Sequence, residues 1–436
     1  MPILILILLV YLIYRLPFFR LEELPSWAVP AIFLIKLLFG FALWAVYTFY
    51  YTDRATSDIY KYYDDAHYAH QAYIENKGAF FGIMTGSPDS SVIAYTAQMK
   101  NWERVFNKAV PFNENRFMIR LNALMMIISG ENIHIHTIFF CFLSFLGCIL
   151  LLRLFQQFLT AGKKKWVIIT LLFPSFLFWT SGGLKESLIV LAIGMMLYGF
   201  LLIRQRGLGA VIMFLSGLVF LLVVKYFLLI SLLPVLIAYY LFIKKTSLRA
   251  VALKYGGIIL ISLAMLQTLS TIDQRVNFAL IISKRQEVSL SEARYMKAGS
   301  ISEIPQVKAN FISVLTHLPI GLWDALMKPY LRQSRNPMML LSAAENVGMV
   351  LLLILALLYR DKKKNYEYNI LLFFAISVLL YFSIIGLITP VLGNLVRYKV
   401  VMMPMLIFLL LYITDISRIP FLRIRLFGFK ENGVGL

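Results

Sequence analysis

The sequence has few charged residues and especially few acids. Only 15% of its 436 residues are charged and 60% are hydrophobic, whereas a soluble domain averages about 25% charged and about 45–50% apolar residues. A chain this apolar does not have enough polar side chains to cover a soluble core of its size. The composition therefore excludes an ordinary soluble enzyme and indicates a chain made mainly of membrane-spanning helices.

Cysteine is almost absent, so a disulfide framework is excluded. Cys141 and Cys148 lie seven residues apart in one apolar run. On a helix they share one face as small core residues, too far apart for a disulfide, and they carry no firm information about the redox compartment.

The N-terminus lacks the basic residues and the Ala-x-Ala cleavage site of a signal peptide. Residues 1–10 are apolar from the start, so we expect a retained span. The chain also shows no internal repeat and no low-complexity segment.

Basic residues outnumber acidic ones by 42 to 22, which gives a net charge of +20. In a soluble protein this excess would suggest nucleic-acid binding. Here the basic residues form short clusters between apolar runs, which is the pattern of cytoplasmic loops in membrane proteins. We therefore expect the lipid bilayer as a partner and no nucleic acid.

The apolar runs predict an all-α polytopic bundle that forms a single integral membrane domain over 1–436. A span needs about 20 apolar residues. About eleven runs qualify: 2–18, 27–50, 133–155, 166–181, 184–203, 208–224, 226–243, 251–269, 338–358, 368–389 and 399–415. The stretch 115–129 contains Arg116 and Arg120 and is typical of a helix at the membrane surface.

The basic clusters predict the orientation of the bundle. Every second connection is basic, and the clusters are Lys163 to Lys165, Arg204 with Arg206, Lys244 and Lys245 with Arg249, Arg360 with Lys362 to Lys364, and Arg418, Arg423 and Arg425. By the positive-inside rule the tail 416–436 is cytoplasmic and the N-terminus faces outward. The connections 51–132, 270–337 and 390–398 also face outward, and the two long ones read as short helices packed on the membrane.

The first long outward loop carries several acids close together. Ser57 is a plausible N-cap for a helix that starts at Asp58, and Asp58, Tyr62 and Asp65 share one face of that helix. Two carboxylates about 10 Å apart beside a tyrosine suit hydrogen bonds to a sugar and the removal of a hydroxyl proton. The alternative is a solvated helix with aspartate in its first turn.

A metal site is a weaker interpretation of the same loop. Asp64, His67 and His70 have helical spacing, but the sequence supplies no obvious fourth ligand, and His134 and His136 lie at the start of a later span. We expect no metal and no cofactor, with a divalent metal as the alternative.

Two further motifs place charge at the ends of spans. In the first, Pro174 and the pair Gly182-Gly183 predict a sharp bend, after which Lys185 and Glu186 enter an apolar run. An ion pair at the lipid boundary is costly unless it faces protein or water, so it is a candidate site; the alternative is a pair that reaches interfacial water.

The second motif is the last outward turn, where Arg397 and Lys399 break the positive-inside pattern. Both suit a phosphate at the outer leaflet, and the alternative is an anchor for lipid headgroups. Arg332 adds a cation in the second long loop. Glu345 lies inside a span, so we expect it to face the bundle interior and to pair there.

These motifs resemble those of bacterial membrane glycosyltransferases of the GT-C type and the related surface-polysaccharide polymerases. The resemblance rests on the acidic outward loop, on Pro174-Ser175 to Lys185-Glu186-Ser187, and on Gly393-Asn394 to Arg397-Tyr398-Lys399. It implies a bacterial inner-membrane enzyme that uses a polyprenyl-phosphate or pyrophosphate sugar. Asp58, Asp64 or Asp65 would be the base, and Lys185, Arg397 and Lys399 would hold the phosphate. The candidate site adds Glu186 as a catalytic residue and, as substrate-binding residues, Tyr62, Arg332 and Glu345.

A physical argument points the same way. Nucleotide sugars are cytoplasmic, so an outward-facing transferase needs a donor that a lipid has already carried across. We expect a polyprenyl-linked sugar donor and a glycan or lipid-linked acceptor as partners, with transfer of either one sugar or a whole repeat unit. The alternative function is a flippase or transporter for a lipid-linked glycan, although transporters usually show repeated halves and charges near the midplane.

Overall fold

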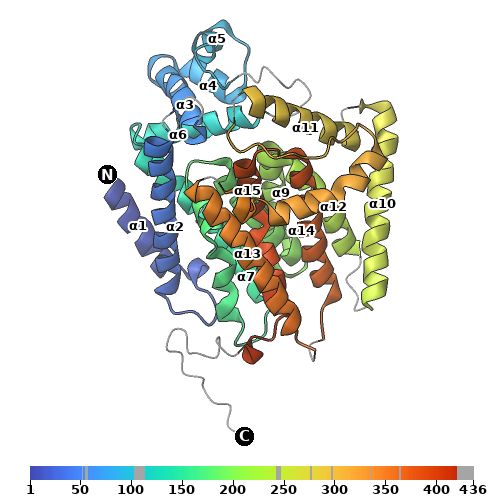
Figure 1. The fold of residues 1–436 in the computed structure, drawn as a ribbon. Coiled ribbons are helices and arrows are strands. Elements are labelled where there is room, and N and C mark those ends of the chain that lie inside the picture. Colours follow the sequence, from blue (N-terminus) through green and yellow to red (C-terminus); the bar gives the residue numbers. More distant parts are fainter. Residues whose placement is uncertain are drawn as a thin grey trace.

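The computed structural model describes residues 1–51, 53–54, 57–102, 113–241, 247–274, 277–295, 298–334, 336–362 and 365–419 (Figure 1). Most of the predicted tail 416–436 lies outside these ranges. The orientation argument also used Lys244, Lys245, Lys363, Lys364, Arg423 and Arg425, which lie outside these ranges, and the side chains of Arg204 and Arg206, which are not described.

The described chain is helical, and eight of its helices are long and apolar enough to cross a membrane. This confirms the predicted class of fold, whereas the count of about eleven spans stays a prediction. The eight are Ala28–Tyr50 (α2, Ala28–Ala45, with a π-turn), α7 (Ile133–Gln156), Lys185–Ile203 and Gly207–Leu241 (both within α9, Lys185–Leu241), α10 (Leu248–Ile272), α13 (Pro337–Leu358), α14 (Tyr368–Ile388) and Leu392–Ile413 (α15, Leu392–Lys399, and α16, Met403–Ile413).

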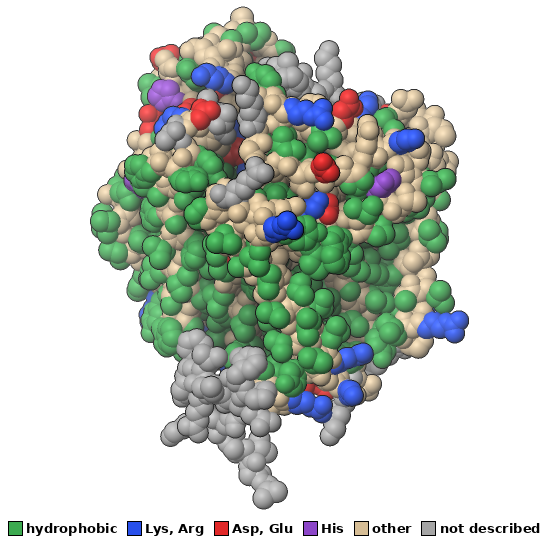
Figure 2. Space-filling view, viewed as in Figure 1, with side chains coloured by type: hydrophobic (Ala, Val, Ile, Leu, Met, Phe, Trp, Pro, Cys, Tyr) green, Lys and Arg blue, Asp and Glu red, His purple; other side chains and the backbone are tan. Residues whose placement is uncertain are grey.

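Shorter helices gather at one end of the bundle. Figure 1 shows α3 to α6 and α11 together at that end, away from the C-terminal end of the described chain. Their bounds are α3 (Asp58–Glu75), α4 (Lys77–Thr85), α5 (Ser90–Thr96), α6 (Glu114–Ser129) and α11 (Phe278–Tyr295), and two more apolar helices are α1 (Pro2–Arg15) and α12 (Phe311–Met327). The two long loops predicted to face outward thus share one end and contain short helices. In Figure 2 hydrophobic side chains cover the middle of the visible face, and most charged ones lie toward the ends.

The connections predicted to be cytoplasmic meet at the opposite end. Lys163 donates to the carbonyl of Thr414 at 2.5 Å, and the N–H of Asp415 donates to the carbonyl of Tyr359 at 2.8 Å. The chain therefore alternates between two ends as predicted, while the side of the membrane that each end faces stays a prediction.

The run 208–243 reverses direction at Lys225. Helical backbone angles are interrupted at Gly207 and at Lys225, where φ is −156° and ψ is 68°. The ring of Phe200 lies 5.4 Å from that of Phe214 and 5.8 Å from that of Tyr239. In one straight helix Phe214 and Tyr239 would be about 37 Å apart. Lys225 is therefore the tip of a helical hairpin, where the sequence placed it.

The predicted span 166–181 is not one helix. A 3₁₀ segment, η3 (Lys164–Leu171), leads into the short α8 (Pro174–Trp179). Proline has no N–H to donate and its φ suits the first helical position, so Pro174 starts a new helix instead of continuing the old one. The bend that we predicted from Pro174 is present, and it divides the predicted span 166–181 into two helical segments.

Both ends of α8 are held by charged side chains. The N–H of Ser175 donates to Glu345 Oε1 at 2.7 Å, and Lys36 Nζ donates to the carbonyl of Thr180 at 2.9 Å and to its hydroxyl at 2.6 Å. An acid at the N-terminus and a cation at the C-terminus both complement the helix dipole. Glu345 faces the interior, as expected, and its partner is a backbone N–H.

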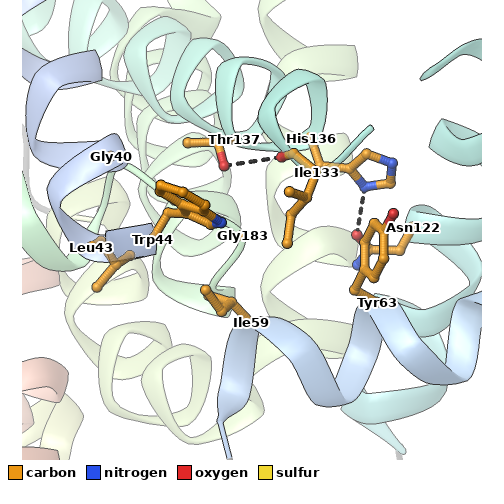
Figure 3. Close-up of a pocket in the computed structure, with 11 residues that line it drawn as sticks. Gly40, Leu43, Trp44, Ile59, Tyr63, Asn122, Ile133, His136, Thr137 and Gly183 are labelled. Atoms are coloured by element: carbon orange, nitrogen blue, oxygen red, sulfur yellow. Dashed lines mark hydrogen bonds between the residues drawn. The ribbon is translucent and has the colours of Figure 1, made fainter. Parts of the chain in front are cut away.

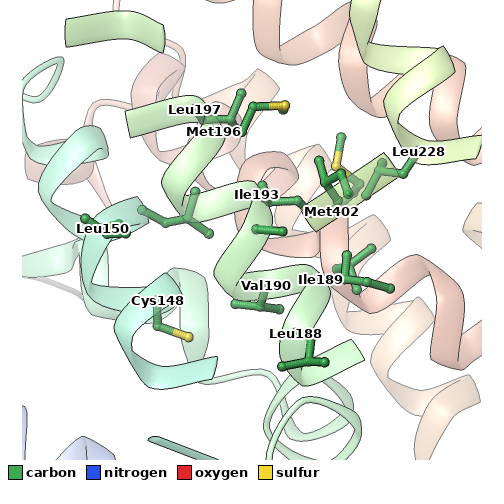
Figure 4. Packing of buried hydrophobic residues seen from close by; sticks show 14 of the residues in the cluster. Cys148, Leu150, Leu188, Ile189, Val190, Ile193, Met196, Leu197, Leu228 and Met402 are labelled. Atoms are coloured by element: carbon green, nitrogen blue, oxygen red, sulfur yellow. The ribbon is translucent and has the colours of Figure 1, made fainter. Parts of the chain in front are cut away.

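The core around α7 and α9 is packed through glycine. A Cβ on Gly147 would lie 2.4 Å from the carbonyl oxygen of Val190, and one on Gly194 would lie 2.5 Å from that of Gly147. Small residues allow two helices to approach this closely in a membrane. Figure 4 shows the apolar side chains around this contact, including Cys148, which is buried and free like Cys141. This close packing holds α9, which begins with the buried Lys185 and Glu186, against α7.

Candidate functional site

The centre of the candidate site is Arg397 on α15, a cation that is 6% exposed. Its guanidinium pairs with Asp58 of α3 through Nη1, and its Nε lies 2.8 Å from Glu186 Oε2 of α9. We call Asp58, Lys61, Glu186 and Arg397 the Arg397 cluster. It joins three elements that lie far apart in the sequence, and each comes from one of the three motifs singled out above.

Asp58 has two cationic partners. As predicted, α3 starts at Asp58 after Ser57, although the Ser57 hydroxyl has no hydrogen-bond partner among the described residues. Asp58 pairs with Lys61, one turn along α3, and with Arg397. Burial alone would raise the pKa of Asp58, but the two cations outweigh it and hold the pKa well below its usual range. The carboxylate is therefore ionised at neutral pH and is a weak base while both cations stay in place.

Lys185 turns away from Arg397 and toward α6. Its Nζ lies 3.2 Å from Glu114 Oε1 and 2.9 Å from Asn115 Oδ1, and 5.1 Å from the centre of the buried Tyr62 ring. Two consecutive residues of α9, Lys185 and Glu186, thus reach two adjacent groups of charge. Sequence reasoning missed Glu114, although an asparagine cap followed by an acid at 113–114 was a visible helix start.

Lys399 is buried two residues beyond Arg397. It donates to Asn346 Oδ1 on α13, and the Asn346 amide donates to the carbonyls of Met327 and Pro329 at 3.1 and 3.2 Å. Glu345, next to Asn346, accepts the N–H at the start of α8. Lys399 and Glu345 therefore lie on the α13 side of the site.

Lys225 is a further buried cation at this end of the bundle. Its Nζ lies 3.7 Å from the centre of the Tyr398 ring, and the Tyr381 hydroxyl donates to the Tyr398 carbonyl at 3.0 Å. All three residues from Arg397 to Lys399 are thus held by other elements. In the sequence Lys225 stands at the break between the predicted spans 208–224 and 226–243, and it was not assigned to the site.

The other predicted acids of the first loop lie outside the Arg397 cluster. Asp64 forms a bidentate pair with the exposed Arg54, with distances of 2.6 and 2.8 Å. Asp65 is buried and accepts the N–H groups of Lys100 and Asn101 at 3.0 and 2.6 Å, and burial raises its pKa. Both carboxylates bind groups of the same long loop. Asp58 is therefore the aspartate of this helix that pairs with Arg397.

Arg332 also lies apart from the Arg397 cluster. It is exposed in the 3₁₀ turn η5 (Leu331–Gln333), and no contact described for it joins Arg397, Lys185 or Lys399.

The histidines of α3 converge on an acid that the sequence did not single out. His67 Nδ1 and His70 Nδ1 each lie 2.9 Å from Glu131 Oε1, and these contacts lower the pKa of Glu131 against the opposing effect of burial. Asp64 is not part of this group. Across the described ranges no set of three His, Cys, Asp or Glu side chains has the arrangement of a metal site. Metal independence stays a prediction.

A small cavity lies between α2, the start of α3 and the start of α7 (Figure 3). Its volume is about 20 Å³, which is room for about one water molecule. Residues of α2, α3, α6 and α7 and of the turn before α9 line it, namely Gly40, Leu43, Trp44, Ile59, Tyr63, Asn122, Ile133, His136, Thr137, Gly182 and Gly183. The glycines let main chain form part of the wall: a Cβ on Gly40 would lie 2.4 Å from the carbonyl oxygen of Ser181.

Comparison of the chain with protein-family models, with curated proteins and with solved structures finds no match in any of the three. The function is therefore argued from the residues and the geometry of the site.

Proposed function

We propose that the protein is a membrane glycosyltransferase. It takes a sugar from a polyprenyl-phosphate or pyrophosphate carrier at the extracytoplasmic face, in the assembly of a cell-surface polysaccharide, and transfers one sugar or a repeat unit. The observation that carries the proposal is the Arg397 cluster. In it an acid of the first outward loop, the acid that opens α9 and the arginine of the last outward turn meet at one buried point.

The charges around this point suit an anionic donor. Five cations lie at or next to the cluster, at Lys61, Lys185, Lys225, Arg397 and Lys399. A phosphate bound at an apolar boundary needs compact cations and a guanidinium, and both kinds are present. The apolar belt below them suits the hydrocarbon part of the same donor.

The pairing of Asp58 supplies a way to couple donor binding to catalysis. A donor phosphate that takes over contacts with Arg397 and Lys61 removes the two cations that depress the pKa of Asp58. The carboxylate then becomes a stronger base. It takes the acceptor hydroxyl proton while that oxygen bonds to the sugar's anomeric carbon, and the bond from that carbon to the phosphate oxygen breaks with its electrons leaving on the phosphate.

The test is sugar transfer by the purified protein in nanodiscs, with synthetic polyprenyl-phosphate hexoses as donors. We expect Asp58→Asn to lower the transfer rate about 10²- to 10⁴-fold, as the loss of a general base does. Asp64→Asn is the matched control, because it makes the same change on the same helix at a carboxylate paired with exposed Arg54. It should keep most of the activity.

Two results would overturn the proposal. Normal transfer by Asp58→Asn would remove Asp58 from the mechanism. Absence of transfer by the wild type, together with movement of a lipid-linked glycan across proteoliposomes, would favour the flippase.

A further inference from the structure

Lys225, at the tip of the α9 hairpin, differs from the other buried cations of the protein. Five lysine and arginine side chains are buried in the described part of the chain. Lys225 is 9% exposed, and the described residues give its ammonium group neither an acid nor an oxygen acceptor; its contact is with the ring of Tyr398, whose centre lies 3.7 Å from Nζ. The other four all have oxygen partners, and they are Lys36, Lys185, Arg397 and Lys399.

An aromatic ring replaces only part of the hydration that the Lys225 ammonium group loses on burial. The face of a tyrosine ring attracts a cation through its quadrupole. The ammonium group, however, has three N–H donors, and buried charges in proteins are normally met by an opposite charge as well as by hydrogen bonds. The hairpin tip therefore has an unmet demand for an anionic oxygen ligand.

The ammonium group of Lys225 is also within reach of such a ligand. Its Nζ is not fully enclosed, in contrast to the indole nitrogen of Trp44, which likewise has no partner among the described residues. A ligand at the surface of the hairpin tip can therefore contact Nζ without a rearrangement of the bundle.

A second cation reaches the same hairpin tip from α11. Figure 1 shows α11 at the same end of the bundle as α15. The guanidinium carbon of the half-buried Arg285 lies 5.6 Å from the centre of the Phe227 ring, and the rings of Tyr226 and Phe227 are 4.0 Å apart. No acid of the described ranges pairs with Arg285 or with Lys225. The tip thus has positive charge that favours an anion.

The surroundings of the tip indicate which anion it suits. Lys225 ends two apolar helical legs, and a phosphate at such a boundary belongs to a lipid headgroup. A compact ammonium group binds phosphate as a point charge. The chains of the lipid would meet the exposed apolar side chains of the two legs, which are Leu215, Val219, Leu233 and Ile237.

We propose that Lys225 binds the phosphate group of a membrane lipid, with Arg285 as a second cation at the same tip. An anionic phospholipid and a polyprenyl phosphate supply the same chemistry, namely a phosphate oxygen at the end of an apolar chain. The site is distinct from the Arg397 cluster, where two carboxylates already meet the cation. The inference does not depend on the proposed function.

The experiment is thermal unfolding of the full chain, delipidated in a non-ionic detergent, with lipids added back. The probes are phosphatidylglycerol and polyprenyl monophosphate, and each is compared with the same chain without phosphate, diacylglycerol or polyprenol. At least one phosphate lipid should raise the melting temperature of wild type by about 3 °C or more above its phosphate-free counterpart.

Lys225→Met removes the charge and keeps a straight apolar side chain. We expect it to lose most of that rise. Without lipid it should melt at or above the temperature of wild type, because it buries no unpaired charge. Lys77→Met is the matched control: Lys77 is exposed on α4 and lies 6.0 Å from the ring centre of Tyr73, so it should respond to lipid as wild type does.

The outcomes identify the lipid or overturn the inference. A rise with phosphatidylglycerol alone assigns the site to a phospholipid, and a rise with polyprenyl monophosphate alone assigns it to a carrier. No rise, equal rises for wild type and Lys225→Met, or an equal rise with sodium phosphate alone contradicts a lipid site at Lys225. A lower melting temperature of Lys225→Met without lipid contradicts the absence of a partner. If Lys225→Met does not fold, Lys225→Gln decides.

This test is separate from the test of the proposed function. Stabilisation by lipid that depends on Lys225, in a protein without transferase activity, supports the lipid site and contradicts the enzyme. Sugar transfer by a protein that shows no such stabilisation supports the enzyme and contradicts the lipid site.

Discussion

At the scale of residues, the positive charge of Arg397 allows two carboxylates, which would otherwise repel each other, to lie close together. Asp58 and Glu186 both contact its guanidinium, and Glu186 is almost fully buried. Buried charges stabilise a fold only as a complete set, because a missing partner leaves an uncompensated charge behind. Each charged side chain of the cluster therefore depends on the others for its stability.

This predicts a large effect of Arg397→Ala on stability. We expect a loss of about 3–5 kcal/mol, because two carboxylates would face each other without a cation. The measurement is thermal unfolding in detergent, and Glu186→Gln added to the variant should recover part of the loss. Arg54→Ala is the control: Arg54 pairs with Asp64 at the surface, so the change should be under about 1 kcal/mol. Equal losses for the two variants would contradict the prediction.

The depressed pKa of Asp58 predicts a particular pH dependence. Its ionised form contributes stability fully above the unfolded pKa, about 3.9, and loses it as pH falls through the lower folded pKa. The difference in melting temperature between wild type and Asp58→Asn should stay constant from pH 5 to 8 and shrink below about pH 4. Thermal unfolding over that pH range measures it. A difference that varies between pH 5 and 8 would show that Asp58 is not paired as described.

The sequence singled out three of the four residues of the Arg397 cluster and missed Lys61. Asp58, Glu186 and Arg397 were identifiable because acids and bases are scarce in an apolar chain and cost free energy at its boundary. Helical periodicity also placed Asp65 on the same helix face as Asp58. In the structure Asp65 instead accepts hydrogen bonds from the N–H groups of residues 100–101. That contact depends on the conformation of a loop, which no local sequence pattern predicts.

At the scale of elements, the contact between α7 and α9 predicts intolerance to a single methyl group. Gly147→Ala places a Cβ against the backbone of Val190 and Leu191, so either the helices separate or the chain distorts. We expect a loss of about 1–3 kcal/mol in stability, as overpacking produces. The measurement is again thermal unfolding.

The matched control is Gly256→Ala on α10, where an added Cβ meets nothing within 4 Å. Alanine also favours helix there, so this variant should be as stable as wild type or slightly more so. Similar behaviour of the two alanine variants would mean that α7 and α9 are not in close contact.

Hydropathy predicted most long helices and failed where the chain bends inside the bundle. The run 166–181 is apolar enough for a span, yet Pro174 divides it into a 3₁₀ segment and a short helix. Apolar composition does not distinguish one long helix from two short helical segments, and Pro174 was the residue that indicated the break. At Lys225 the reverse holds, because one cation in a continuous apolar run marked the true reversal of the chain.

At the scale of the whole molecule, the two sets of connections predict opposite chemical accessibility. With both native cysteines replaced, a cysteine at the exposed Lys77 of α4 should react with an impermeant maleimide from outside intact cells. A cysteine at the exposed Lys362 should react only after permeabilisation. The opposite pattern would place the Arg397 cluster in the cytosol, where nucleotide sugars are available and the argument for a lipid-linked donor no longer holds.

The alternation of the chain between two ends was predictable because it depends on local properties: the length of each apolar run and the charge of each connection. The arrangement of helices around α9 was not, because it depends on which surfaces fit one another. The cavity that Trp44 and His136 line is a product of that fit, and no pattern in the sequence predicted it.

The charges that hold α8 have a mechanical consequence. Glu345 of α13 holds its first turn and Lys36 of α2 holds its last, so this short helix ties α2 to α13 through its dipole. Any movement that draws α2 and α13 apart has to pull a charge away from a helix end. Opening of the bundle to admit a long lipid chain would therefore take place between other helices. During that movement α8 would stay in place, and so would Lys185 and Glu186, which follow it in the chain.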